Sequence, residues 1–446
     1  MARVLLLFFV CFGSSLCDGF IKKHHRRQAA PSLVPVEEYW FVQKLDHFSG
    51  ADTRVWKQRY FVNDSYVQKG GPVFLMIGGE GPANPAWMTS GAWLTYAEKL
   101  GALCLMLEHR FYGKSHPTKD MSTDNLRYLS SQQALADIAH FQTIMMESLG
   151  LAERKWVALG GSYPGSLAAW YRIKYPHLVH MAVASSAPVK ALVDFSGYLE
   201  VVQLALARNH SDCPKTIKVA SEEVINLLSH KNYKKLTADF KLCELLEIHS
   251  SMDESFFIDT LAEYIMNVVQ YNMDNREFEG VKDTSITIQV VCDIMSNNSL
   301  GDSYDRYATV MRTITEMNGE RCIDASYKKY TQDFKNATWT PVSTGDSGCI
   351  RHVRNFGFFQ SSDSTAQPFS GIPLSYHVQQ CSDIFGPEFN LSMITDSVQK
   401  TMSFMEDLKY KAATSFPNGL IDPWHLLGIN SDLSEDLIAV QMEVTF

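Results

Sequence analysis

The stretch Trp156-Val-Ala-Leu-Gly-Gly-Ser162-Tyr-Pro-Gly-Ser-Leu-Ala-Ala-Trp170 carries the strongest structural signal in this 446-residue chain. Residues 156–159 are apolar without polar alternation, which is typical of a strand that is buried on both faces. A turn of small residues around Ser162 follows, and residues 165–175 then have a helical pattern that stops before Pro176. A strand, a tight turn and a helix in this order place the Ser162 hydroxyl at the sharpest point of the turn.

This arrangement is that of the nucleophile elbow of α/β-hydrolases. Gly160 stands two residues before the serine, as the motif requires, whereas Pro164 replaces the glycine that the motif has two residues after it. Proline is compatible with the first turn of a helix. We therefore predict that Ser162 is a nucleophile and that the backbone N–H of Tyr163, at the helix N-terminus, stabilises an oxyanion. The alternative interpretation is an ordinary Gly/Ser loop.

Other apolar runs predict further buried strands, at residues 73–77, 103–107, 181–184, 412–416 and 437–442. Helical patterns over residues 85–100 and 131–149 lie between the earlier runs, and alternating strands and helices are typical of an α/β domain with a parallel sheet.

The run at residues 73–77 ends in Gly78-Gly79-Glu80-Gly81, which lacks the Lys-Ser/Thr and the glycine spacing of phosphate-binding loops. Because this loop lies upstream of an elbow, we predict that Gly79 supplies the second oxyanion donor.

The pattern changes between residues 192 and 350, where helical periodicity at 220–230, 236–247 and 256–271 occurs with no clear strand between. We interpret this region as a mainly helical cap inserted into the core. Residues 20–191 then form the first part of the core, and residues 351–446 form the cap edge and the return to the core. The predicted fold is an α/β-hydrolase core with an inserted, mainly helical cap domain.

The N-terminus indicates the secretory pathway. Residues 1–19 have a positive start, a short apolar run and small residues before a polar turn, which predicts a signal peptide; a short membrane anchor is the alternative. Glycosylation sequons agree with an extracellular or lysosomal location, and they stand at Asn63, Asn209, Asn297, Asn336 and Asn390.

Seven cysteines follow residue 19, with no C-x-x-C pair, so disulfides are expected rather than a zinc site. Their odd number means that one thiol is free or that its partner is missing from this chain.

The composition excludes several partners. The net charge is −9, and no basic stripe or Lys/Arg-rich tract of the kind that neutralises phosphates is present, which argues against nucleic acid. We interpret the basic run at residues 22–27 as a solvated tail, with a processing site as the alternative. No later stretch approaches the length of a membrane span. The sequence implies no metal or organic cofactor.

Several motifs together resemble the serine peptidase family of lysosomal Pro-Xaa carboxypeptidase, dipeptidyl peptidase II and thymus-specific serine protease. They are Gln43-Lys-Leu-Asp-His-Phe48, Leu107-Glu-His-Arg-Phe-Tyr-Gly-Lys-Ser-His-Pro117, Tyr128-Leu-Ser-Ser-Gln-Gln-Ala-Leu-Ala-Asp137 and Asn418-Gly-Leu-Ile-Asp-Pro-Trp424, besides the elbow. The resemblance covers residues 40–440, and the elbow wording is most similar to the thymus-specific branch. It implies serine-type exopeptidase activity on short peptides, commonly with proline beside the scissile bond, and a homodimer.

The resemblance also implies roles for individual residues. Ser162 would be the nucleophile, and Asp422 would orient the catalytic histidine, although an Asp-Pro pair is also a common turn. Glu108, His109 and Arg110 match family positions near the site, and we interpret them as a packed polar cluster behind the elbow.

The match is incomplete at the C-terminus. In this fold the triad runs Ser, Asp, His, and the family's histidine would fall just past Phe446. His425 is the one histidine after Asp422, but it precedes the strand that normally separates acid from base. We therefore expect the C-terminal strand and helix of the core to be incomplete. Residues 348–355 also depart from the family pattern.

Two alternatives to an active peptidase remain. Without its histidine the chain would be a catalytically impaired, peptide-binding relative. An esterase or lipase is the other alternative, because an elbow alone does not select the acyl substrate.

Overall fold

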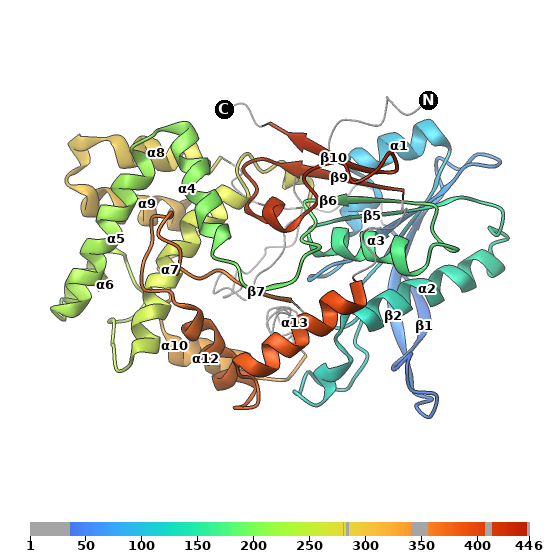
Figure 1. The fold of residues 1–446 in the computed structure, drawn as a ribbon, viewed down its shortest axis with the longest axis horizontal. Helices are drawn as coiled ribbons and strands as arrows, with labels where there is room; N and C mark the ends of the chain where they lie inside the picture. The colour runs from blue at the N-terminus through green and yellow to red at the C-terminus, as the bar shows by residue number, and fades with distance from the viewer. Residues whose placement is uncertain (1–35, 280, 282–284, 340–355, 406–412, 444–446) are drawn as a thin grey trace.

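The computed structural model describes residues 36–279, 281, 285–339, 356–405 and 413–443. The predicted signal peptide, Cys349 and the divergent segment 348–355 lie outside these residues. Figure 1 shows a sheet with flanking helices in one half of the molecule and an all-helical assembly in the other.

The first half is built on an eight-stranded sheet of order β1-β2-β4-β3-β5-β6-β9-β10. The β1–β2 and β2–β4 pairs are antiparallel, and the other neighbours are parallel. The strands span Tyr39–Lys44 (β1), Val55–Asn63 (β2), Val73–Ile77 (β3), Leu103–Leu107 (β4), Trp156–Gly161 (β5), Met181–Ser185 (β6), Thr414–Gly419 (β9) and Leu437–Met442 (β10).

The helices α1 (Ala92–Leu100), α2 (Ser131–Ser148) and α3 (Tyr163–Lys174) cover the sheet. Alternate residues of β3 belong to two separate apolar clusters: Leu75 packs in the cluster that contains residues of α2 and α3, whereas Phe74 packs in the cluster that contains residues of α1. Both faces of the strand are therefore buried, which explains why its sequence is apolar without alternation.

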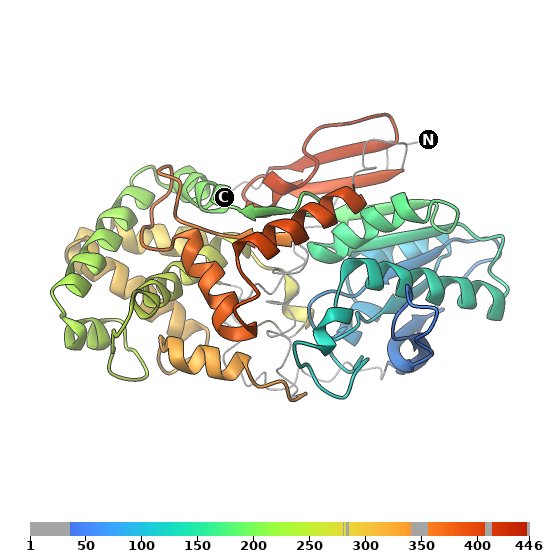
Figure 2. The same ribbon diagram turned by 60° about the horizontal axis from the view of Figure 1, so that its bottom comes forward.

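The second half is the helical cap, seen at the left of Figures 1 and 2. Its helices span Gly197–Asn209 (α4), Cys213–Ser229 (α5), Tyr233–Asp239 (α6), Ser251–Gln270 (α7), Ile288–Ser296 (α8), Ser303–Met317 (α9), Tyr327–Phe334 (α10) and Leu374–Phe385 (α12). Helix α13 (Leu391–Met405) leads back toward the sheet. A short parallel pair, β7 (Leu192–Asp194) and β8 (Gly357–Phe359), lies where the chain passes between the halves. The predicted α/β class with a helical cap is confirmed.

Two disulfides, Cys213–Cys292 and Cys243–Cys322, join segments of the cap. Cys104 and Cys381 are buried free thiols. The disulfides fit a protein of the secretory pathway. Within the described ranges, the structure contains no helix with the length and apolar character needed to span a bilayer.

Most predicted strands are confirmed, but two predicted helices are wrong in extent. The helix predicted for residues 85–100 is divided into a 3-10 turn, η2 (Pro85–Met88), and α1, because Gly91 between them has a φ of 99°. The helix predicted for residues 236–247 ends at Asp239, since Leu242 forms a β-bridge with Ile323 and the next residue is a disulfide cysteine.

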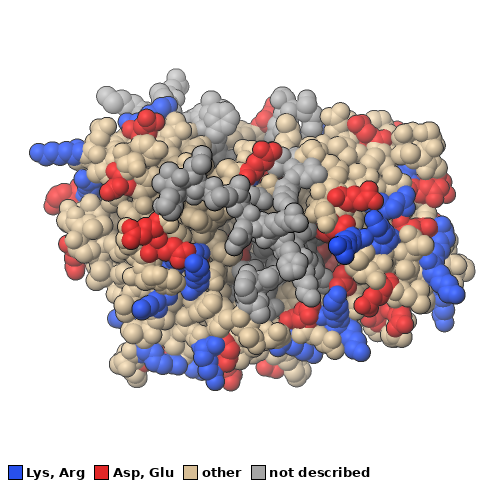
Figure 3. Space-filling view, turned by 180° about the vertical axis from the view of Figure 1, so that it is seen from behind, with Lys and Arg blue, Asp and Glu red and all other residues tan. Residues whose placement is uncertain are grey.

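On the face shown in Figure 3, the acidic and basic side chains of the described residues are interspersed. Of the sequon residues, Asn297, Asn336 and Asn390 are exposed, whereas Asn63 is half-buried and its amide donates to the carbonyl of Met88 at 2.7 Å.

Candidate active site

Ser162 lies in a sharp turn between β5 and α3. Its backbone angles, φ 58° and ψ −133°, are unfavourable for a residue with a side chain. The conformation is held on both sides, because the Ser162 N–H donates to the carbonyl of Ser185 at 2.8 Å and the Ser166 N–H donates to the carbonyl of Ser162 at 3.0 Å. The structure therefore contains the strand–turn–helix geometry that the sequence predicts, with Tyr163 as the first helical residue.

Tight packing explains the glycines around this turn. A Cβ on Gly160 would lie 2.2 Å from the carbonyl oxygen of Pro164, so no larger residue fits before the serine. A Cβ on Gly79 would lie 2.5 Å from Cγ of the same proline. The Gly79 loop therefore packs against Pro164, the residue that departs from the usual motif. This contact places the two predicted oxyanion donors, Gly79 and Tyr163, beside the elbow.

The Ser162 hydroxyl is buried, with the residue 2% exposed. Its Oγ has no hydrogen-bond partner among the residues that the structure describes. A buried hydroxyl without a partner is costly in a folded protein, and such groups are concentrated at functional sites.

Asp422 follows β9 and caps the short helix η8 (Pro423–Leu427). Its Oδ1 accepts a hydrogen bond from the Trp424 N–H at 3.1 Å, whereas its Oδ2 is shielded from solvent and has no partner in the described part of the chain. Burial raises the pKa of this carboxyl group from 3.8 to about 6, against the opposing effect of hydrogen bonds from the Ser186 side chain and the Trp424 N–H.

Consecutive residues of one loop connect the serine and the aspartate. Ser185 at the end of β6 accepts the Ser162 N–H, and the next residue, Ser186, contacts Asp422. Because β5, β6 and β9 are adjacent parallel strands, their carboxyl ends meet at one edge of the sheet. The two predicted site residues, far apart in sequence, therefore converge there.

Histidines near these residues are engaged elsewhere. The Nδ1 atom of His425 hydrogen-bonds to the backbone carbonyl of Asp422 at 2.6 Å, not to its carboxylate. The ring nitrogens of His109 contact the carbonyl of Arg110 at 2.7 Å and the hydroxyl of Tyr163 at 3.0 Å. In the ranges that the structure describes, no histidine ring hydrogen-bonds to Ser162 Oγ or to the Asp422 carboxylate.

Residues 108–110, which directly follow β4, belong to a buried polar network. Glu108 is fully buried and accepts hydrogen bonds from Arg59, from Ser115 Oγ at 2.8 Å and from the Ala83 N–H at 3.0 Å. Arg110, also fully buried, forms an ion pair with Asp137 at 2.6 Å. The interpretation of Glu108, His109 and Arg110 as a packed polar cluster is confirmed, and the sequence analysis missed Arg59 and Asp137 as its counter-charges.

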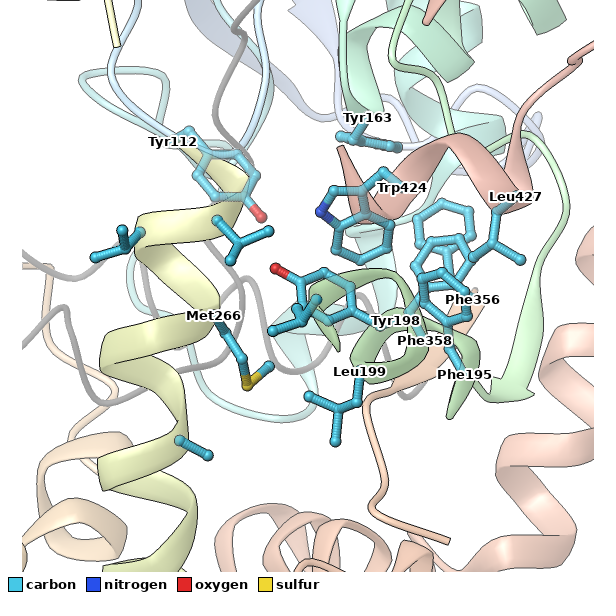
Figure 4. Close-up of a cluster of buried hydrophobic side chains, with 14 of the residues drawn as sticks. Tyr112, Tyr163, Phe195, Tyr198, Leu199, Met266, Phe356, Phe358, Trp424 and Leu427 are labelled. Atoms are coloured by element: carbon cyan, nitrogen blue, oxygen red, sulfur yellow. The ribbon is translucent and has the colours of Figure 1, made fainter. Parts of the chain in front are cut away.

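Aromatic side chains line the junction between the elbow and the cap (Figure 4). Ring centroids of Tyr163 and Phe356 are 5.5 Å apart, those of Phe356 and Phe358 are 5.3 Å apart, and those of Phe358 and Trp424 are 5.4 Å apart. Tyr198 of cap helix α4 continues the series at 5.6 Å from Trp424. The sequence analysis did not identify this cluster, whose members come from four separate segments.

Comparison with known proteins agrees with this geometry. The sequence profile of the family described as Serine carboxypeptidase S28 matches residues 43–445. Mouse (Mus musculus) thymus-specific serine protease is 32% identical over 94% of this chain and 82% of its own length. The human (Homo sapiens) protein of that name is 30% identical over 88% of this chain and 77% of its own length. Human lysosomal Pro-X carboxypeptidase is less similar, at 29% identity over 90% of this chain and 80% of its own length.

The profile match covers nearly all of the described core and cap. The strand–serine–helix turn, the convergent aspartate and the relatives' sequences lead to the same assignment. This chain belongs to the serine carboxypeptidase S28 family of serine-type peptidases.

Proposed function

We propose that this protein is an exopeptidase of the secretory pathway, lysosomal or extracellular, that cleaves short peptides with proline next to the scissile bond. The observation that carries the proposal is a pair of buried oxygens, Ser162 Oγ and Asp422 Oδ2, that have no hydrogen-bond partner among the described residues. The consecutive residues Ser185 and Ser186 contact Ser162 and Asp422, respectively, at the same edge of the sheet. The cap and its aromatic junction above this edge support short rather than extended protein substrates. The name of the Pro-X carboxypeptidase relative supports the preference for proline.

In the proposed mechanism, Ser162 Oγ attacks the peptide carbonyl carbon and forms an acyl-enzyme, which water then hydrolyses. The N–H groups of Tyr163 and Gly79 stabilise the negative charge on the carbonyl oxygen of the tetrahedral intermediate. A histidine between Ser162 Oγ and Asp422 Oδ2 takes the serine proton and returns it to the leaving amine, while Asp422 fixes the tautomer of the ring. Among the described residues, both oxygens are available to hydrogen-bond such a ring, and no histidine occupies that position.

A second candidate function is a catalytically impaired relative that binds peptides without cleaving them. An unassisted serine hydroxyl is a weak nucleophile, and a general base contributes about 10²–10⁴-fold in rate. The two functions are distinguished by the reactivity of Ser162.

The test is labelling of the full chain with a fluorophosphonate, together with hydrolysis of peptides that carry proline near the N-terminus or near the C-terminus. Ser162→Ala is the control. Labelling and cleavage that both disappear in the control support the exopeptidase, and mass spectrometry of the products shows which end is cleaved. Labelling that requires added imidazole supports the impaired relative, since imidazole then replaces a missing base. Cleavage by the control variant contradicts the role of Ser162.

The resemblance to the family also leads us to propose a homodimer. Sedimentation velocity of the glycosylated protein tests this, and a monomer at micromolar concentration contradicts it.

A further inference from the structure

One side-chain oxygen connects the cap to the loop that carries Asp422. Gln270 is the last residue of α7, and its Oε1 accepts hydrogen bonds from the Tyr198 hydroxyl at 2.7 Å and from the Trp424 indole Nε1 at 3.0 Å. Tyr198 belongs to α4, and Trp424 belongs to η8. Three segments that are distant in sequence therefore meet at one acceptor.

The single indole donor of Trp424 is satisfied by Gln270. Trp424 is 3% exposed, and an indole carries a single N–H, which is here used on Gln270. Removing the acceptor would leave a buried N–H without a partner, which is more costly than the hydrogen bond itself is favourable. The indole would then move to find another partner or water.

Such a movement would reach the carboxylate. The backbone N–H of the same residue, Trp424, donates to Asp422 Oδ1 at 3.1 Å. The Trp424 ring also packs against Phe195 and Phe358, with centroid distances of 5.6 and 5.4 Å, so a rotation of the ring alone would disturb these contacts. Figure 4 shows the indole nitrogen and the Tyr198 hydroxyl directed toward α7.

We propose that Gln270 is a positioning residue, which orients the Asp422 carboxylate by fixing the indole of Trp424. This inference rests on the proposed role of Asp422. Gln270 acts through Trp424 and contacts neither Ser162 nor the substrate bond. The cap therefore contributes to the geometry of the catalytic acid as well as enclosing the substrate.

A second contact between cap and core provides a matched control. Nine residues after Gln270, the carbonyl of Glu279 accepts a hydrogen bond from Asn84 Nδ2 at 3.1 Å, and nearby Phe278 packs edge-on against Trp87 at 4.8 Å. This contact joins the segment after α7 to η2 of the core, whereas Gln270 joins α7 to η8. Asn84→Ala removes a cap–core hydrogen bond without touching Trp424.

The experiment compares Gln270→Leu, Gln270→Glu and Asn84→Ala in the full chain, at temperatures where circular dichroism shows all of them folded. The readouts are the indole ¹H–¹⁵N signal of Trp424, assigned with Trp424→Phe, and kcat and KM for a proline-containing peptide. We expect Gln270→Leu to shift the indole signal and to lower kcat by about 10- to 100-fold, the cost of a misplaced catalytic group, with a smaller change in KM.

Gln270→Glu keeps an acceptor oxygen in the same place, so it should restore most of kcat and the indole signal. Asn84→Ala should leave both unchanged. An unshifted indole signal in Gln270→Leu, or an equal loss of kcat in Asn84→Ala, would overturn the proposal. If the unmodified chain neither cleaves nor reacts with fluorophosphonate, the proposed function has failed, and the indole signal alone then decides whether Gln270 positions Trp424.

Discussion

Replacing Gly79 with alanine tests how the two proposed oxyanion donors, Gly79 and Tyr163, are held together. The added Cβ would lie 2.5 Å from Cγ and 3.0 Å from Cδ of Pro164, whereas carbon atoms in good contact are about 3.5–4.0 Å apart. One side must therefore retreat by about 1 Å. Pro164 is held in the elbow, with its carbonyl packed against Gly160, so we expect the Gly79 loop to move instead.

The magnitude follows from this displacement. Misplacing a catalytic group by about 1 Å costs on the order of 10²-fold in rate. Loss of one oxyanion donor costs about 10²–10³-fold, which is the same range. We expect kcat to fall by about 10²-fold with little change in KM, because the N–H of Gly79 acts on the charge that develops in the transition state.

A double-mutant cycle with Pro164→Ala identifies the cause. Truncating the proline ring removes both clashing atoms, so Gly79→Ala should cost much less activity in that background. Gly78→Ala is the structural control: its Cβ would meet backbone atoms, the carbonyl oxygen of Leu107 at 2.6 Å and the N atom of His109 at 2.9 Å, so it should lower the melting temperature. Full activity of Gly79→Ala, or an undiminished loss in the Pro164→Ala background, would refute the steric argument.

Three further predictions concern charge and covalent structure. Because burial raises the pKa of Asp422 to about 6, the ionised carboxylate lowers stability above that pH, and this penalty is absent below its ordinary pKa of 3.8. The Asp422→Asn variant should therefore have a higher melting temperature than the unmodified chain at pH 8 but not at pH 4, and an equal difference at both pH values would contradict this. Its kcat should fall by about 10⁴-fold. Glu108→Gln removes the fully buried one of the two carboxylates that pair with Arg59 and leaves only the more exposed Glu38, so it should lower the free energy of unfolding by about 3 kcal/mol in denaturant titrations. A Glu108→Leu/Arg59→Met double variant that is no more stable than Glu108→Gln would exclude charge burial as the cause. The Cys213–Cys292 bond closes a loop with a sequence separation of 79, so the Cys213→Ser/Cys292→Ser variant should be less stable by about 4 kcal/mol in calorimetry. An unchanged unfolding temperature would show that the cap without this disulfide is already constrained.

The sheet could be predicted from sequence because its signal is local. Residues 73–77 and 103–107 form strands with the predicted ends, since burial on both faces leaves an uninterrupted apolar run. The prediction for residues 236–247 failed because helical periodicity there competes with a disulfide and a β-bridge to residues about 80 positions away. No local pattern reports such a constraint.

The residues of the candidate site likewise differ in whether a local sequence pattern predicts them. Ser162 and Tyr163 could be predicted as site residues because the strand, turn and helix that position them are contiguous, and Gly79 because it follows a recognisable strand. Two contacts could not be predicted from the sequence. One is the contact of Gly79 with Pro164, and the other is the joining of Tyr198 and Trp424 by Gln270, whose hydrogen bonds span 72 and 154 residues. Asp422 required the family resemblance, because an Asp-Pro pair by itself is a common turn.

The pairing of β6 with β9 has a consequence for biosynthesis. Ala182 lies opposite Thr414, so roughly 230 residues, the cap included, are translated before the edge of β6 gains its partner. At about 5–20 residues per second this takes on the order of ten to fifty seconds, during which an unpaired strand edge is open to aggregation. The nascent chain carries Ser162 throughout that interval, but Asp422 reaches it only when β9 closes the sheet. The order of synthesis thus delays assembly of the proposed catalytic pair, Ser162 and Asp422, until the cap has been made.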